Sequence, residues 1–232
     1  MQVPNEQKRR HITSAAAKMF AARPYHKVRL DDIAAAAGVA KGTLYVYFDS
    51  KEDLYFTLTL EGFAQLVDRL NAQLEGGADG EAVAGRGNVN GFVHSKRLAS
   101  SPRVRPACAL GCASSARLEC IVHELVAYAY QHPHLYELLR TVGAAKVRSK
   151  GAWDAKCRQL TQLIERTIRA GVAAGELSDP HPELTALCIP GMVRSLMLFG
   201  AKGISEKDAA DQIVKLLSRG LAADRPARKA AS

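Results

Sequence analysis

Residues 32–54 read DIAAAAGVAKGTLYVYFDSKEDL and determine the class of fold. Carboxylates at Asp31 and Asp32 suit the N-terminus of a helix that ends at Gly38, because the helix dipole favours negative charge there. A second helix is predicted over 40–48, after a very short turn. Two helices joined through a short turn that contains glycine predict a helix-turn-helix.

The sequence on both sides of this motif also has a helical period. In residues 6–22, apolar side chains recur at helical spacing on one face, and Pro24 ends the pattern. A longer helix is predicted from 51 to about 74. No alternating strand pattern flanked by turn signals occurs along the chain. The fold class is therefore predicted to be all-α.

Composition and charge limit the classes of protein that this chain can represent. With 232 residues, 47% hydrophobic and 24% charged, the chain has ordinary globular composition, which excludes disordered, collagen-like and disulfide-scaffold proteins. The net charge is +9, and residues 1–51 hold nine Lys or Arg against four acidic residues. This asymmetry predicts a small basic module that meets a polyanion, joined to a neutral helical body.

The second helix of the motif is expected to enter the major groove of DNA. On a helical wheel, Leu44 and Phe48 share the inward side. The outward surface and its flanks carry Gly42, Thr43, Tyr45 and Val46. That surface is uncharged apart from Lys41, which suits the reading of base edges together with contact to the backbone.

Residues 32–54 closely resemble the DNA-binding signature of the TetR/AcrR family of bacterial transcriptional regulators. The resemblance is strong over residues 8–60, and elsewhere it rests on helix order and on loop signals such as GVAAGEL at 171–177. It implies a cytoplasmic homodimeric repressor whose C-terminal helical domain binds a small molecule. Binding of that molecule would lower the affinity for a palindromic DNA operator.

The resemblance also implies roles for single residues. It places Lys41, Thr43 and Val46 at base edges, Tyr45, Tyr47 and Lys51 at phosphates, and Gly42 where the backbone comes close to DNA. An alternative for Tyr47 is that of an ordinary helix aromatic, because its side chain leans toward the Leu44 side. Arg29 and Ala40 stand where the family usually has a hydroxyl residue, so two helix caps are missing and Arg29 is predicted to contact phosphate directly.

Residues 76–117 interrupt the helical pattern with many glycines and with six Lys or Arg against two acidic residues. An unstructured stretch of this length inside a compact domain is uncommon. Three interpretations stay open: a basic insertion that adds nonspecific affinity for DNA, a passive disordered loop, and a stretch read in a shifted frame.

Three of the five cysteines cluster in the sequence: Cys108, Cys112 and Cys120, followed by His123. Soft ligands in a cluster suggest a metal site or a thiol sensor, but these spacings match no closed zinc pattern. Incidental or buried thiols are the preferred interpretation, and no metal or cofactor is expected.

Cytoplasmic location with reduced thiols is expected from the odd cysteine count and from the absence of a leader-like segment. The most apolar window, 184–201, contains Pro190 and Arg194, so no membrane span is expected.

Four residues with polar tips are candidates for contact with a small molecule: Tyr128, His132, Tyr136 and Trp153. The alternative is that each of them is a packed core aromatic. The identity of the effector does not follow from the sequence.

The last two helices, predicted near 182–200 and 205–222, are apolar beyond one stripe. Nine residues are predicted to form a symmetric dimer contact: Leu184, Leu187, Gly191, Ser195, Leu198, Ile213, Leu216, Leu217 and Leu221. The alternative is a self-contained core without a partner. The predicted domains are 1–51 for DNA binding and 52–222 for regulation and dimerisation, with a disordered tail at 223–232.

Three other classes of function compete with a ligand-responsive regulator. An enzyme is disfavoured, because the chain has no phosphate-binding glycine loop, no nucleophile elbow and no recognisable pair of acidic residues. A nonspecific architectural DNA-binding protein without a ligand, and a regulator whose sensing domain is impaired by residues 76–117, both stay open.

Overall fold

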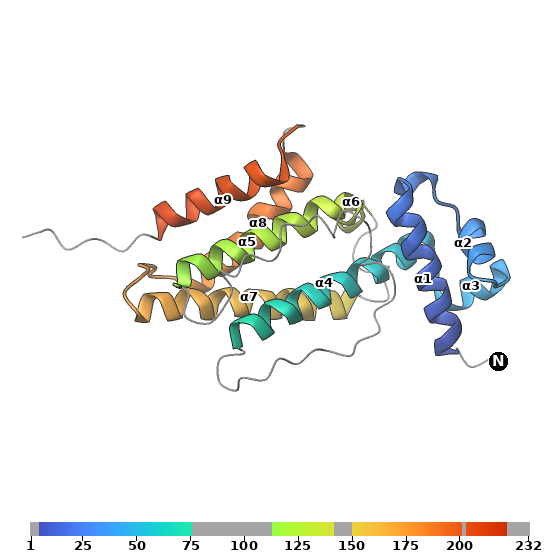
Figure 1. Ribbon diagram of the computed structural model, residues 1–232, viewed down its shortest axis with the longest axis horizontal. Helices are drawn as coiled ribbons and strands as arrows, with labels where there is room; N and C mark the ends of the chain where they lie inside the picture. Colours follow the sequence, from blue (N-terminus) through green and yellow to red (C-terminus); the bar gives the residue numbers. More distant parts are fainter. Residues whose placement is uncertain (1–4, 76–112, 142–149, 201–202, 222–232) are drawn as a thin grey trace, which may run out of the picture. The chain divides into compact units, whose positions relative to one another are not determined.

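The computed structural model describes residues 5–75, 113–141, 150–200 and 203–221, and the secondary structure in these ranges is helical, without a strand (Figure 1). The elements are α1 (Glu6–Ala22), a 3-10 turn (Tyr25–Lys27), α2 (Leu30–Ala36), α3 (Lys41–Tyr47), α4 (Lys51–Glu75), α5 (Ser114–Gln131), α6 (Pro133–Thr141), α7 (Lys150–Ala173), α8 (Pro182–Phe199) and α9 (Glu206–Gly220). The prediction of an all-α fold is confirmed.

The chain forms two compact units. The first contains the described residues up to Asp68 and those from His132 to Lys156, and the second contains the remaining described residues. The domain boundary predicted after residue 51 falls at the first residue of α4, a helix that continues to Glu75. A division of the chain at that point stays a prediction.

The core of the first unit forms under the helix-turn-helix. Ile12, Ile33, Leu44 and Phe48 are fully buried, and Met19 and Phe20 of α1 pack against them. Burial of a large apolar side chain stabilises the fold by roughly 1.5–3 kcal/mol. The apolar face predicted for α1 and the inward side predicted for α3 are both confirmed.

The turn between α2 and α3 depends on Gly38, whose φ of +67° lies in the left-handed region that favours glycine. The Val39 N–H donates to the Ala34 carbonyl and closes the end of α2. Arg29 and Ala40 occupy the N-cap positions of α2 and α3, and neither side chain makes a capping hydrogen bond. The two missing caps expected from the sequence are therefore missing in the structure.

In the second unit, α5 packs against α8 and α9 (Figure 1). The apolar side chains of α5 are buried almost all round the helix: Leu118, Ile121, Val122, Leu125, Val126 and Ala129. The helix begins at Ser114, whose N–H donates to the Glu176 carboxylate at 2.6 Å. The prediction that irregular structure continues to residue 117 is wrong for residues 114–117, because this hydrogen bond starts the helix at Ser114. The rest of that predicted stretch, residues 76–112, lies outside the described residues.

The last turn of α7 and the loop after it each require a glycine. A Cβ atom on Gly171 would lie 2.6 Å from the Leu177 side chain and 2.7 Å from Ser114 Cβ, so the close approach needs glycine. Gly175 has a φ of +70°, a conformation that other residues rarely adopt. The loop signal at 171–177 thus has a direct physical cause.

Candidate nucleic-acid interface

Helix α3 has one buried side and one exposed side, as predicted. Leu44 is fully buried, whereas the Tyr45 and Val46 side chains are 45% and 53% exposed. Gly42 is exposed, and no atom lies within 4 Å of the position where its Cβ would be. The exposed side therefore leaves room for a second molecule to approach the helix backbone closely.

The charge at the start of α3 is paired. Lys41 Nζ lies 2.8 Å from one carboxylate oxygen of Asp31 and donates a hydrogen bond to the other at 3.2 Å. This hydrogen bond raises the pKa of the Lys41 ammonium above its ordinary value. Sequence analysis assigned Lys41 to base edges but missed Asp31 as its partner. An acidic residue ten positions before a lysine indicates an ion pair only once the turn between the two helices is known.

Lys51, at the start of α4, rests on an aromatic ring. Its ammonium lies 4.1 Å from the centroid of the Tyr25 ring, a cation–π contact. Partial burial lowers the pKa of Lys51. The Tyr25 hydroxyl in turn donates to the Glu52 carboxylate at 2.9 Å. Tyr25 therefore positions the Lys51 ammonium, which is predicted to contact phosphate.

Tyr47 has a structural role in this state of the molecule. Its hydroxyl accepts a hydrogen bond from the Asn5 N–H at 2.8 Å and donates to the Asn5 carbonyl at 3.3 Å. Its ring is half-buried against the core of the first unit. These contacts favour the alternative role for Tyr47, in which it is a helix aromatic that connects α3 to the start of α1. They speak against a contact of Tyr47 with phosphate.

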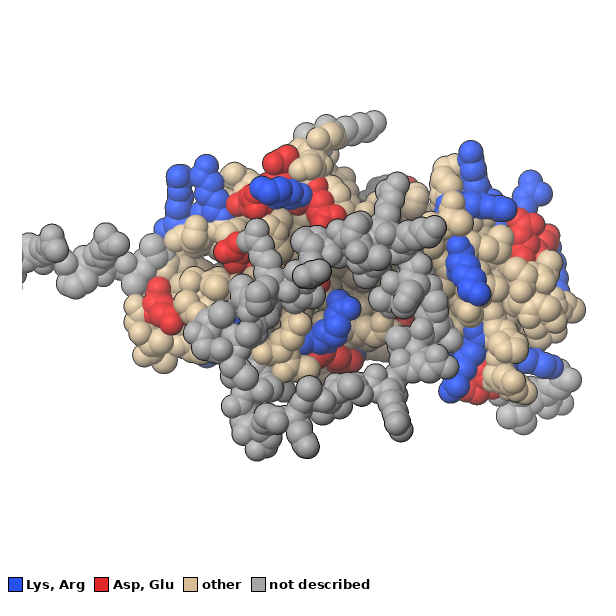
Figure 2. Space-filling view, viewed as in Figure 1, with Lys and Arg blue, Asp and Glu red and all other residues tan. Residues whose placement is uncertain are grey.

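The remaining predicted residues lie on the same part of the chain. Arg29 is exposed at the N-cap of α2, and Thr43 is half-buried on the flank of α3. In Figure 2, basic side chains are spread over the α1–α3 part of the molecule with a few acidic side chains between them. This distribution suits a surface that binds a polyanion.

The four candidates for ligand contact are not brought together in one described site. Tyr128 belongs to the second unit, whereas His132, Tyr136 and Trp153 belong to the first. Tyr128 and His132 are buried, and burial lowers the pKa of His132 to about 4. The Trp153 ring stacks on Phe63 with 4.6 Å between the ring centroids. A shared ligand site for the four residues stays a prediction.

A second surface is exposed and apolar, and it lies on α8 and α9. Among the predicted dimer residues, Leu184, Leu187 and Leu216 are 54%, 60% and 54% exposed. Gly191 and Ser195 are exposed as well, and Leu198 and Leu217 are half-buried.

Two of the predicted dimer residues, Ile213 and Leu221, are only 6% and 7% exposed. They belong to the core of the protomer rather than to the exposed face. Phe199, 79% exposed at the end of α8, is an apolar residue of this helix that sequence analysis missed. Its spacing of four residues after Ser195 was a usable signal.

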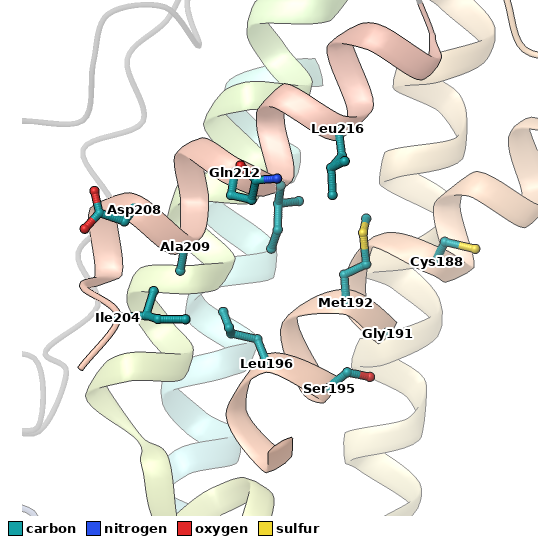
Figure 3. Close-up of a pocket in the computed structure, with 11 residues that line it drawn as sticks. Cys188, Gly191, Met192, Ser195, Leu196, Ile204, Asp208, Ala209, Gln212 and Leu216 are labelled. Carbon is teal, nitrogen blue, oxygen red and sulfur yellow. The ribbon is translucent and has the colours of Figure 1, made fainter. Parts of the chain in front are cut away.

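A pocket of about 580 Å³ opens between α8 and α9 (Figure 3). Met192 and Leu196 of α8 point toward Ala209 and Leu216 of α9 across this pocket. Its lining is mostly apolar and includes none of the four candidate ligand residues.

Helix α8 also has the length and apolar composition of a membrane-crossing helix, with a mean hydropathy of 1.2 over its 18 residues. It carries Pro190 in its interior and the exposed Arg194. Length and composition alone are shared by core helices and membrane-crossing helices, so the expectation of no membrane span stays a prediction.

The cysteines divide into two groups. Cys157 and Cys188 are free thiols, whereas Cys120 is disulfide-bonded, so the expectation of reduced thiols is wrong for Cys120. Cys108 and Cys112 lie outside the described residues. His123 lies 3.5 Å from the Asp211 carboxylate, and the described part of the chain holds no group of three residues able to bind a metal ion.

Comparison with known proteins identifies the class as that of bacterial regulatory proteins with a helix-turn-helix. Residues 12–58 match the model of "Bacterial regulatory proteins, tetR family", and residues 111–221 match "Tetracyclin repressor-like, C-terminal domain". The two matches together cover more than half of the chain. The protein belongs to the TetR family.

Curated relatives match through the N-terminal part. The "Fatty acid metabolism regulator protein" of Bacillus subtilis is 38% identical over 64 residues, which are 28% of this chain and 33% of the relative. The "HTH-type transcriptional activator FasR" of Mycolicibacterium smegmatis is 35% identical over 72 residues, 31% of this chain and 33% of the relative. The chain spans about a third of the length of these relatives.

Solved structures match over nearly the whole fold. A TetR/AcrR regulator from Thermobifida fusca is 21% identical with a TM-score of 0.63, over 96% of this chain and 100% of that one. FadR from Bacillus subtilis, solved with stearoyl-CoA, is 16% identical with a TM-score of 0.56, over 90% and 97% of the two chains. At these identities, the likeness concerns the fold.

Proposed function

We propose that the protein is a sequence-specific transcriptional regulator, a homodimeric repressor that a small molecule releases from a palindromic operator. The observation that carries the proposal is the exposed side of α3, where Tyr45 and Val46 project above the buried Leu44 within a helix-turn-helix. The relatives named above are regulators, which supports a function in the cytoplasm without enzymatic activity.

In this proposal the residues of the interface divide by task. Val46, Thr43 and Lys41 contact base edges, where apolar and hydrogen-bonding groups select sequence. Tyr45 and Lys51, together with Arg29, contact phosphates, which fix the position of the helix but carry no sequence information. Gly42 allows close approach, and Tyr47 fixes α3 against the first residues of α1 through Asn5.

The α8–α9 face supplies the dimer contact in the proposal. Exposure of several large apolar side chains on one face is unfavourable in water, and a second copy of the same face would cover them. The side chains concerned are Leu184, Leu187 and Phe199. Two protomers related by a two-fold axis would place two recognition helices one turn of DNA apart, about 34–36 Å. That spacing requires an operator with two half-sites.

The C-terminal helices are proposed to bind the effector. Support comes from two neighbours in fold, FadR solved with stearoyl-CoA and AibR solved with isovaleryl coenzyme A and operator DNA. These two thioesters are the first probes to add to a preformed complex with DNA. Release of the protein from its operator by either probe would support the proposal.

The test of the proposed function is the selection of bound sequences from a randomised DNA pool by the purified full chain. A palindromic consensus, bound at least about 10³-fold more tightly than random DNA, supports the regulator. Steep salt dependence without a consensus would replace it by a nonspecific architectural protein. Tyr45→Ala and Lys51→Ala should weaken binding to every sequence, whereas Lys18→Ala, an exposed change on α1, serves as control.

A further inference from the structure

The ion pair between Asp31 and Lys41 connects the starts of α2 and α3. Both carboxylate oxygens of Asp31 lie within 3.2 Å of the Lys41 ammonium, and the two side chains are 59% and 57% exposed. Lys41 is also the only charged residue of α3. The single cation of the recognition helix is thus held by an acid of the preceding helix.

An exposed pair of this kind contributes little to folding. Its larger effect is expected in a complex with DNA. Affinity for DNA of arbitrary sequence comes almost entirely from cations that reach phosphates, and each such contact steepens the dependence on salt. A lysine held by a carboxylate must leave its partner before it can make that contact.

Affinity for a preferred sequence has a different origin, because base edges contribute directional hydrogen bonds and apolar contacts. On the operator, the Lys41 ammonium can exchange Asp31 for the base edge assigned to it above, whereas on random DNA it can exchange Asp31 only for a phosphate. The exposed Tyr45 and Val46 side chains do not depend on the pairing of Lys41. The ion pair should therefore weaken binding to random DNA more than binding to the operator.

We propose that Asp31 is a specificity-determining residue, whose carboxylate holds the Lys41 ammonium at the corner of the helix-turn-helix and so suppresses binding to DNA of arbitrary sequence. This inference rests on the proposed function, because it assumes that α3 faces DNA. It assigns to Asp31 a role in discrimination rather than in folding.

The neighbouring Asp32 provides a matched control. It is exposed, it lies in the same first turn of α2 and it carries the same charge. Within the described ranges, it has no hydrogen bond or ion pair with another side chain. Asp31→Asn and Asp32→Asn therefore remove equal charge from nearly the same place, but only the former releases Lys41.

The experiment measures Kd for a random duplex and for the selected operator over a range of salt, with each variant alone and combined with Lys41→Ala. On random DNA, the slope of log affinity against log salt concentration should be steeper for D31N than for D32N by about one unit. Lowering the salt from 200 to 50 mM should therefore tighten binding by D31N roughly three- to fourfold more than binding by D32N. The operator affinity should change less, so the ratio of operator to random affinity falls. With Lys41→Ala, the two variants should become equal.

Two results would overturn the inference. Equal effects of D31N and D32N on random DNA would show that only bulk charge matters. A difference between them that persists with Lys41→Ala would show that Asp31 acts without Lys41. These results are distinct from failure of the proposed function, which would appear in the unchanged protein as equal affinity for operator and random DNA.

Discussion

The surface around α3 and the surface of α8 and α9 differ in which of their large apolar side chains are exposed to water. Around α3 the side chains of Leu44 and Phe48 are buried, at 0% and 1% exposure, and the exposed side carries Lys41, Tyr45 and Val46. On α8 the large apolar side chains lie outside, with Leu187 at 60% and Phe199 at 79% exposure. The first surface can stay in water until DNA binds, whereas the second is suited to a permanent apolar partner.

The same contrast exists within α8. One side of the helix, with Ala186, Ile189 and Val193, is buried in the core of the second unit. The opposite side holds Leu184 and Leu187. A helix that is apolar on two sides needs two partners, and the described part of the protomer covers only one of these sides.

The largest expected effect follows from disruption of the apolar surface. Leu187→Glu should convert a dimer into a monomer and lower operator affinity by about 100-fold or more, because the second half-site is then no longer held in place. Sedimentation equilibrium and titration with DNA measure both effects. Val172→Glu, at an exposed apolar position of α7, is the control. A Leu187→Glu protein that stays dimeric would remove the proposed role of this surface.

The next prediction compares substitutions on the buried and on the exposed side of α3 by their effects on stability and on base preference. Leu44→Ala leaves a cavity under the helix-turn-helix and should lower the free energy of unfolding by about 2–5 kcal/mol. Val46→Ala should change stability by less than about 0.5 kcal/mol, since its side chain is 53% exposed. It should instead change the preferred base at one position of each half-site. Chemical denaturation and repeated selection from a DNA pool check the two expectations.

Acid should act on the unit that carries the helix-turn-helix, because His132 belongs to it and is buried. Burial lowers the pKa of His132 to about 4, so protonation favours the unfolded state, in which the pKa is near the ordinary 6.5. Stability should fall as the pH drops below 6.5 and level off below about 4, with a total loss on the order of 3 kcal/mol.

Chemical denaturation at a series of pH values measures this loss. His132→Gln should remove it, whereas His11→Gln, at an exposed position of α1, should leave it in place. An unchanged pH dependence in His132→Gln would show that the loss arises from other groups.

The smallest expected effect concerns the missing caps of the DNA-binding part. Asn5 and Ser205 cap α1 and α9 with side-chain hydrogen bonds, whereas Ala40 at the start of α3 makes none. Ala40→Ser should stabilise the protein by about 0.5–1 kcal/mol. Ala35→Ser, at an exposed position in the last turn of α2, should have the opposite sign, because serine is a poorer helix former than alanine. Thermal unfolding of both variants measures the difference.

The sequence predicted the elements around α3 well, because each boundary there has a local cause. Gly38 makes the turn, Pro24 ends the pattern of the first helix, and the buried positions recur at helical spacing. The start of α5 was placed too late, since Ser114 is fixed by the Glu176 carboxylate. That contact joins residues far apart in the chain and leaves no local signal.

The candidate site was predictable in its residues but not in its pairings. Exposure of Tyr45 and Val46 follows from a helical wheel. The contacts of Lys41 with Asp31 and of Lys51 with Tyr25 join different elements, and their geometry depends on how those elements pack. The hydroxyl of Tyr47 shows the same limit, because only the folded chain brings it to Asn5.

The central claim is that operator binding needs both surfaces, one for DNA and one for a second copy of the chain. It is tested most directly by comparing the affinity of the full chain for its selected operator with that for the same duplex with one half-site scrambled, and by counting the protomers bound. The account predicts two protomers on the intact operator and at least about 100-fold weaker binding to the scrambled one. Equal affinity for both duplexes, with one protomer bound to each, would contradict it.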